Sequence, residues 1–300
     1  MPRKTRHFKR YKPSKTAGEE GVATPLHDRR QARILAVANQ KGGVGKTTTT
    51  VNLATAMAAV GKRVLILDLD PQGNASTGLG IGPDQRGEGT YALLFADESL
   101  KNVSRETEVP GLDIVPSTTD LAGADIELVN AEEREFRLLQ ALSGESADMG
   151  YDYIFIDCPP SLSLMTLNAL VAAHAVIIPL QCEFYALEGL SQLTKTLERV
   201  KRTFNPGLNI HGVLLTMYDS RNNLSGSVAE DVRSYFGETV YQTVIPRNVR
   251  ISEAPSYGLP AMVYDMNCTG SRAYISLAKE VLRREGETVA RDRQATTAVA

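Results

Sequence analysis

The stretch NQKGGVGKTT, residues 39–48, decides the fold of this 300-residue chain. The apolar residues 34–38 precede it, and residues 47–60 follow with the spacing of a helix. A glycine-rich turn between a strand and a helix is the setting of a phosphate-binding loop, because glycines let the backbone approach phosphates and the helix N-terminus favours negative charge. The alternative, a structural turn that carries a lysine by chance, is disfavoured by the complete motif in this setting.

Several residues of this loop have a definite chemical use. Lys46 can reach the β- and γ-phosphates of a nucleotide, and Thr47 can offer its hydroxyl to Mg²⁺. The general pattern has a glycine at the position of Gln40, and this chain adds a lysine, Lys41, at the front of the loop. The motif predicts these nucleotide-binding residues: Lys41, Gly42, Gly43, Val44, Gly45, Lys46, Thr47 and Thr48.

Two later apolar segments end in carboxylates. One runs into Asp68 and Asp70, which strand alternation places on the same face, and the other runs into Asp157. Ligands of α/β sheets bind beyond the carboxyl ends of the strands, where a buried acid needs a cation or hydrogen bonds. These acids either cap the following turns or lie beside Mg²⁺ and the attacking water. Together with the phosphate loop they favour the second interpretation, in which Asp157 acts on Mg²⁺ through a water molecule.

Apolar strand-like segments alternate with helical patterns over most of the chain. This alternation predicts an α/β fold with a single doubly wound, mostly parallel sheet and helices on both faces. The expected strands are residues 34–38, 64–67, 112–115, 153–156, 176–180, 213–216 and 240–245. The expected helices are residues 47–60, 121–142, 163–173, 187–204, 227–236 and 272–284.

Three regions follow from this pattern. Residues 33–285 are expected to form one ATPase domain, and residues 286–300 a polar C-terminal tail. Residues 1–32 carry seven basic side chains before their first acid, so we expect a disordered tail. That tail is either a solvated leader or an arm that touches phosphates.

Composition and charge limit the possible functions. The net charge of −2 does not indicate a nucleic-acid partner, so any DNA binding must come from local patches. Three cysteines without metal-ligand spacing and four scattered histidines predict a reduced cytosolic protein without a zinc site. The longest apolar stretch, near residues 170–180, is too short to cross a bilayer, and the basic N-terminus lacks the apolar segment of a secretory signal.

The segment KGGVGKT, with its leading lysine, resembles the deviant Walker A motif of the ParA/MinD class of P-loop ATPases. A MinD-like protein is expected to end in a membrane-binding amphipathic helix, and residues 287–300 contain no cluster of large apolar side chains. The resemblance therefore favours the ParA/Soj branch without a membrane anchor. Five further segments are similar to chromosomal ParA/Soj proteins: DLDPQGNASTGLG (68–80), DCPPS (157–161), PLQCEFYALEG (179–189), LLTMY (214–218) and IPRNVRISEAP (245–255).

The resemblance implies roles for particular residues. Lys41 would cross a dimer interface and contact the phosphates bound by the other subunit, as an arginine finger does in trans. Asp70 would orient the attacking water, and Asp68 would hold the hydration shell of the metal. The catalytic residues would then be Lys41, Lys46 and Asp70; the metal-site residues would be Thr47, Asp68 and Asp157; and Met217, Pro246, Arg247 and Asn248 would enclose the adenine.

Basic residues in two places are candidates for DNA binding. Lys195, Arg199 and Arg202 share one face of the expected helix 187–204, and the others lie in loops near strand ends. A solvated charged surface is the alternative. Glu198 occupies a position where some relatives carry a DNA-contacting arginine, which makes Arg199 the candidate substitute. The full set is Lys195, Arg199, Arg202, Arg221, Arg247 and Arg250.

The resemblance thus implies an ATP- and Mg²⁺-dependent partition ATPase for chromosomes or plasmids. ATP would drive sandwich homodimerisation and non-specific binding of double-stranded DNA, and a ParB-like centromere-binding partner would stimulate hydrolysis and release. Such a protein would be cytoplasmic and nucleoid-associated. Two alternatives remain open, namely a MinD-like membrane-bound regulator and an ATPase that positions a protein cargo.

Overall fold

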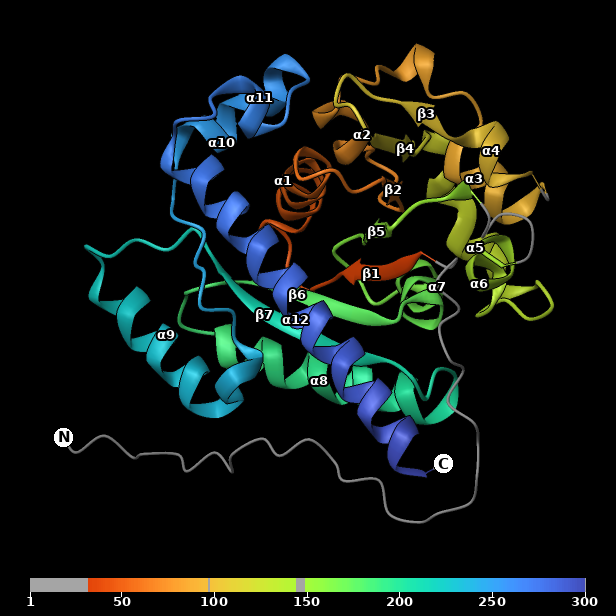
Figure 1. Cartoon of the computed structure of the whole chain (residues 1–300). Helices are drawn as coiled ribbons and strands as arrows, with labels where there is room; N and C mark the ends of the chain where they lie inside the picture. Colours follow the sequence, from red (N-terminus) through yellow and green to blue (C-terminus); the bar gives the residue numbers. More distant parts are fainter. Residues whose placement is uncertain (1–31, 97, 144–148, 300) are drawn as a thin grey trace.

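The computed structural model describes residues 32–96, 98–143 and 149–299, with side chains as far as residue 286. The expected N-terminal tail, apart from Ala32, lies outside the described residues. The described part is one α/β unit in three layers, with helices on both faces of a central sheet (Figure 1).

The sheet has seven strands in the order β3-β4-β2-β5-β1-β6-β7. All neighbouring strands pair in parallel except β3 and β4, so the predicted fold class is confirmed. The short antiparallel β3 lies at one edge of the sheet. The strands are β1 (Arg33–Val37), β2 (Val64–Asp68), β3 (Arg105–Glu106), β4 (Leu112–Val115), β5 (Tyr153–Asp157), β6 (Ala175–Gln181) and β7 (Asn209–Thr216).

Alternate strand residues supply two apolar cores. Leu35 and Val37 of β1 face one core, while Ile34 and Ala36 face the other. The first core is covered by α1 (Lys46–Ala59), α2 (Asn74–Gly78), α10 (Val249–Glu253), α11 (Ala261–Tyr264) and α12 (Thr269–Val299). The second is covered by α3 (Gly89–Phe95), α4 (Leu100–Val103), α5 (Ala124–Val129), α6 (Arg137–Ala141), α7 (Leu164–Ala172), α8 (Ala186–Thr203) and α9 (Asn223–Phe236). Short 3-10 turns are η1 (Pro83–Gln85), η2 (Thr119–Gly123), η4 (Gly237–Thr239) and η5 (Ala254–Tyr257).

The prediction of a strand at residues 240–245 is wrong. This segment makes one isolated bridge to β7, between Val240 and Val213. The carboxylate of Glu280 in α12 accepts the backbone N–H groups of Gln242 and Thr243 at 2.8 and 2.9 Å. The N–H groups of Tyr241 and Ile245 still donate to backbone oxygens of β7, but the side chain of Glu280 takes the two donors in between, and no continuous ladder forms.

Two helix predictions are also wrong in extent. The expected helix 121–142 is divided into η2, α5 and α6, with Asn130 at the C-cap of α5 and a φ of 48° at Glu133. Asn168 of α7 bonds to the backbone N–H of Leu138 and the backbone oxygen of Arg134, so a tertiary contact occupies groups of the interrupted region. The last helix, expected over residues 272–284, extends as α12 to Val299. No proline or glycine follows Gly286 to stop it.

Candidate nucleotide-binding site

The loop between β1 and α1 has the backbone geometry of a phosphate-binding loop. Gly43 and Gly45 have φ angles of 72° and 89°, in the left-handed region that glycine adopts at low cost. Gly45 lies directly before α1, and no side chain caps the N-terminus of that helix. The first N–H groups of α1 are therefore available to bind an anion.

Lys46 is the first residue of α1, and its side chain is buried against the loop. It is 6% exposed, and its Nζ donates to the backbone oxygen of Lys41 at 3.1 Å. Burial lowers the pKa of Lys46, whereas the charges of Asp157 and Asp70 oppose this decrease. The ammonium group thus lies between the loop and the carboxylates, where phosphate oxygens would complete its hydrogen bonds.

The strand register brings two predicted acids together at the carboxyl edge of the sheet. Asp68 at the end of β2 lies beside Asp157 at the end of β5, and both are fully buried. Asp157 Oδ1 accepts the hydroxyl of Thr50 at 3.1 Å, but its Oδ2 is buried without a partner. Burial, together with the charge of Asp68, raises the pKa of Asp157 to about 8. An unpaired buried carboxylate oxygen beside a phosphate loop indicates a cation site.

Asp68 has a different environment. Its Oδ1 accepts the N–H of Asp70 at 3.2 Å, and its Oδ2 accepts the N–H and hydroxyl of Ser76 at 2.9 and 2.7 Å. Burial raises the pKa of Asp68 to about 6, although the hydrogen bonds from Ser76 oppose the increase. In these contacts Asp68 fixes the turn that carries Asp70, which is 9% exposed and accepts the N–H of Gln72 at 3.0 Å.

The oxygen atoms at this site fit an Mg²⁺ ion that is also bound by a nucleotide. Among the described residues, no group of three His, Cys, Asp or Glu side chains forms a self-sufficient metal site. Mg²⁺ usually takes one or two protein carboxylates and completes its shell with substrate phosphates and water. Thr47 beside Asp157 would offer these oxygens, with Asp68 placed to support them.

Lys41 lies at the exposed rim of this site. Its Nζ pairs with Glu183 in the segment between β6 and α8, and both side chains are about half exposed. Nearby segments at the same edge expose three large apolar side chains, which are Leu162 after β5 and Phe184 and Tyr185 after β6. The side chain of Lys41 is therefore at the surface, and the apolar side chains at the same edge are exposed to solvent in the monomer.

The segment after β7 also contacts the phosphate loop. The hydroxyl of Thr216 donates to the backbone oxygen of Val44 at 2.8 Å. Met217 follows with a φ of 49°, and a Cβ on Gly45 would lie within 3.9 Å of its side chain. Tyr218 then forms a bridge to Pro246. Met217 thus lies against the loop, and Pro246 lies beside the next residue, Tyr218.

The remaining residues predicted to enclose the adenine have other contacts. Arg247 donates its N–H to the oxygen of Tyr218 at 3.1 Å. Asn248 caps α10 by accepting from Arg250 and Ile251, and its amide nitrogen donates to Thr269 at 2.8 Å. The side chain of Asn248 is therefore committed to the fold, and the base contacts of these residues stay a prediction.

The candidate DNA-binding residues are exposed, but they differ in their partners. Lys195, Arg199 and Arg202 lie on the exposed face of α8, as the spacing predicts. Arg221 pairs with Asp219. The last two members of the set are Arg247, which is exposed, and Arg250, which pairs with Glu253 and Asp265.

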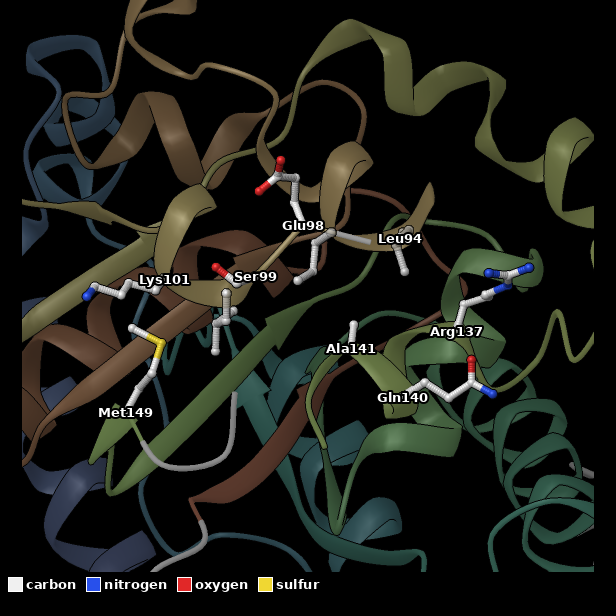
Figure 2. A pocket seen from close by; sticks show the side chains of 10 residues that line it. Leu94, Glu98, Ser99, Lys101, Arg137, Gln140, Ala141 and Met149 are labelled. Carbon is white, nitrogen blue, oxygen red and sulfur yellow. The ribbon is translucent and has the colours of Figure 1, made fainter. Parts of the chain in front are cut away.

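A cavity of about 480 Å³ lies elsewhere, between α3, α4 and α6. Leucines from α3 and α4 line it, and Figure 2 shows the charged ends of Glu98, Lys101 and Arg137 pointing in different directions. It lacks the converging polar groups of the phosphate loop, so it does not compete as the reaction centre.

Sequence reasoning missed three supporting residues. Thr216, Glu183 and Ser76 contact the loop backbone, Lys41 and Asp68, respectively. Thr216 ends an apolar strand, and a polar residue at that position is a detectable signal. The other two are recognised through contacts across the fold.

A phosphate loop, a buried lysine and acidic strand ends at the carboxyl edge of a parallel sheet define a P-loop nucleotide-binding protein. A family model described as an AAA domain matches residues 32–210. The chain is 57% identical over 266 residues to the chromosome partitioning protein ParA of Caulobacter vibrioides, covering 89% of this chain and 98% of that protein. It is 54% identical over 249 residues to the sporulation initiation inhibitor protein Soj of Bacillus subtilis, covering 83% and 98%.

A solved structure shares the fold. Cobyrinic acid a,c-diamide synthase from Mycobacterium smegmatis, with bound ADP and magnesium, is 38% identical with a TM-score of 0.74. The match covers 85% of this chain and 96% of that one. On the strength of the relatives, this chain belongs to the ParA/Soj family of chromosome partitioning proteins.

Proposed function

We propose that this protein is a nucleotide-controlled partition ATPase, in which ATP governs dimerisation and DNA binding. The protein is an ATPase that uses ATP and Mg²⁺, as its family and its nucleotide-bound structural neighbour indicate. The observation that carries the proposal is the position of Lys41. This lysine lies exposed at the rim of a site whose buried groups, Lys46 and Asp157, are already assembled.

Each residue has a defined task in hydrolysis. Lys46 and the first N–H groups of α1 hold the phosphates, and Thr47 and Asp157 hold the ion. Asp70, on the turn fixed by Asp68, orients the attacking water. Mg²⁺ supplies neutralisation of the phosphate charge when bound. Catalysis then proceeds by positioning and electrostatics without a covalent enzyme intermediate.

The exposed rim supports dimerisation through the same edge of the sheet. Phe184 and Tyr185 are 75% and 69% exposed, and large aromatic side chains of this kind are enriched at the centres of protein interfaces. When two subunits meet there, Lys41 leaves Glu183 and contacts the phosphates held by the partner subunit. ATP favours the dimer because it binds that state better than the monomer.

The DNA contacts follow from the dimer. It joins the basic residues of two chains, and phosphate contacts of this kind are independent of base sequence and sensitive to salt. A ParB-like centromere-binding protein then stimulates hydrolysis, and the protein leaves the DNA. Binding of this kind places the protein at the nucleoid.

Two alternatives share the same nucleotide site. A MinD-like regulator would bind membranes, and an ATPase that positions protein cargo would act on a large assembly. No described helix combines the length and apolar character needed to cross a bilayer. The high identity to the Caulobacter and Bacillus relatives along nearly their whole length favours partition.

The test is binding to a duplex of arbitrary sequence at several salt concentrations, in ATP and in ADP. Strong, salt-sensitive binding in ATP and weak binding in ADP would support the proposal. Equal binding in both nucleotides would leave an ATPase without the switch. Absence of binding in both would direct attention to a membrane or a protein cargo, which liposome sedimentation with ATP distinguishes.

A further inference from the structure

The segment that follows β7 presents an arginine of the proposed DNA surface already paired to an acid. Arg221 Nε and Nη2 donate to Asp219 Oδ1 and Oδ2, each at 2.9 Å. The backbone N–H of Arg221 also donates to Asp219 Oδ1 at 3.0 Å. Both oxygens of Asp219 therefore hold the edge of the guanidinium that carries Nε and Nη2.

This pair is not needed to bury a charge. The side chain of Arg221 is 87% exposed and that of Asp219 is 25% exposed, so water could solvate the guanidinium in the absence of the acid. The hydrogen bonds from Arg221, with the charge of Arg247, lower the pKa of Asp219 to about 2. Asp219 is thus ionised at neutral pH and lies close to two members of the candidate DNA-binding set.

Backbone contacts hold the acid in this place. Tyr218 donates its N–H to the oxygen of Ile245 and accepts the N–H of Arg247, at 3.0 and 3.1 Å. On the preceding side, Thr216 is bonded to Val44 of the phosphate loop. Contacts of the preceding residues therefore hold the backbone that places the Asp219 carboxylate beside Arg221.

A phosphate group and the Asp219 carboxylate compete for the same donors. An arginine offers the Nε and Nη2 edge to planar carboxylates and to phosphates alike, with two parallel hydrogen bonds. We infer that Asp219 sets the DNA affinity of this protein by holding Arg221, so that DNA phosphate must displace the carboxylate in order to bind. This inference rests on the proposed DNA-binding function and names an acidic residue that regulates that surface.

The competition has a distinct salt signature. When phosphate replaces Asp219, the released carboxylate attracts cations and offsets part of the counterion release from DNA. An Asp219→Asn variant keeps an oxygen for the N–H of Arg221 but removes the charge. Its binding constant should therefore depend more steeply on salt, by at most about 0.9 in the slope of log K against log salt.

The test measures the affinity of the full chain, in ATP, for an arbitrary-sequence duplex across a salt series. Asp219→Asn is expected to bind about two- to fivefold more tightly, the range that an exposed ion pair supports. Glu230→Gln, which removes an equal charge from an exposed position on the neighbouring α9, is the matched control and should change affinity less. Arg221→Ala should bind more weakly than the unmodified chain.

A variant that carries both substitutions shows whether the effect of Asp219 on DNA affinity depends on Arg221. In the Arg221→Ala background, Asp219→Asn should lose most of its gain and the change in salt slope. An equal gain in that background, or no gain in the unmodified background, would overturn the inference while leaving DNA binding established. Absence of DNA binding by the unmodified chain would overturn the proposed DNA function and this inference together.

Discussion

The two edges of the sheet both bury charged side chains, but they balance those charges differently. At the amino edge, Glu285 of α12 pairs with Arg33 of β1 at 3.0 Å and with His211 of β7 at 3.1 Å. At the carboxyl edge, Asp68 and Asp157 form no ion pair within the described residues. The amino edge has a completed cluster, whereas the carboxyl edge leaves a buried acid oxygen unpaired.

This difference indicates that the amino edge anchors the fold, whereas the carboxyl edge is a ligand-binding site. A buried cluster with paired charges fastens one element to others, as Glu285 fastens α12 to two strands. A buried carboxylate without a partner is unfavourable until a cation or ligand arrives. Substitutions at the amino edge should therefore change stability, and substitutions at the carboxyl edge should change binding and turnover.

The largest effect is expected from Asp70→Ala, on turnover. Without the group that orients water, hydrolysis should fall about 100- to 10,000-fold while ATP binding is retained. Single-turnover hydrolysis and equilibrium titration of ATP measure the two separately. Asp84→Ala, at an exposed position of η1, is the control. Normal hydrolysis by Asp70→Ala would show that another group orients the water.

Lys46→Ala tests whether the carboxyl edge binds the phosphates of ATP. A buried ammonium group that pairs with phosphate makes a strong contact, so ATP affinity should fall at least about 100-fold. Calorimetric titration with ATP and Mg²⁺ measures the loss. Lys62→Ala, in the turn between α1 and β2, should bind ATP normally. An affinity unchanged by Lys46→Ala would place the phosphates elsewhere.

Glu285→Gln tests the amino edge. It leaves Arg33 and His211 without their shared carboxylate, so the free energy of unfolding should fall by about 2 kcal/mol. That loss corresponds to a decrease in Tm of roughly 4–8 °C. Thermal unfolding measures it, with Glu238→Gln at an exposed position as control. A large loss of ATP affinity with unchanged Tm would contradict an anchoring role.

Asp157→Asn should stabilise the ligand-free protein, in contrast to Glu285→Gln. The amide keeps an acceptor for Thr50 and avoids the cost of either burying a carboxylate or protonating it, because folding raises the pKa of Asp157. The free energy of unfolding should therefore rise by about 1 kcal/mol. The additional stabilisation that Mg²⁺ gives in the presence of nucleotide should then be lost. Thermal unfolding with nucleotide, with and without Mg²⁺, checks both effects. A destabilised ligand-free variant would mean that the carboxylate is already compensated.

The smallest effect concerns pH at the amino edge. Burial raises the pKa of Glu285, but the hydrogen bond from His211 and the charge of Arg33 outweigh it and lower the pKa below the usual 4.5. A carboxyl whose pKa is lowered by folding stabilises the protein above its unfolded pKa and loses that contribution as pH falls through the folded pKa.

The stability difference between the unmodified chain and Glu285→Gln should thus be complete near neutral pH. This difference in the free energy of unfolding should narrow as the pH falls below about 4.5. Denaturant unfolding at a series of pH values measures this difference. A gap that widens on acidification would show that the ion pairs do not lower the pKa of Glu285.

The carboxyl edge was predictable because its signals are local. The glycines and Lys46 occur in one motif, and strand alternation together with parallel pairing places Asp68 beside Asp157. The central strands and the long helices α1, α8 and α9 follow from periodicity in the same way, with bounds that differ by a few residues.

The parts that sequence reasoning missed depend on side chains that act across the fold. Glu280 satisfies the backbone at Gln242 and Thr243, and it lies about forty residues further along the chain. Asn168 does the same for the interrupted helix near Leu138. Local periodicity reveals the apolar residues of these segments, but it does not reveal a side-chain acceptor that lies far away in the sequence. The same reason explains why the partner of Lys41, Glu183, was found only in the structure.

The hydrogen bond from Thr216 to Val44 has a thermodynamic consequence. It joins the phosphate loop to the short segment that ends at Arg221, so the proposed ATP and DNA sites are connected through one stretch of backbone. Coupling between two binding equilibria is reciprocal. If ATP raises the affinity of the protein for DNA by some factor, DNA must raise its affinity for ATP by the same factor. Under the proposed function, DNA is therefore also an effector of the nucleotide site, and a subunit bound to DNA has a higher affinity for ATP than one in solution.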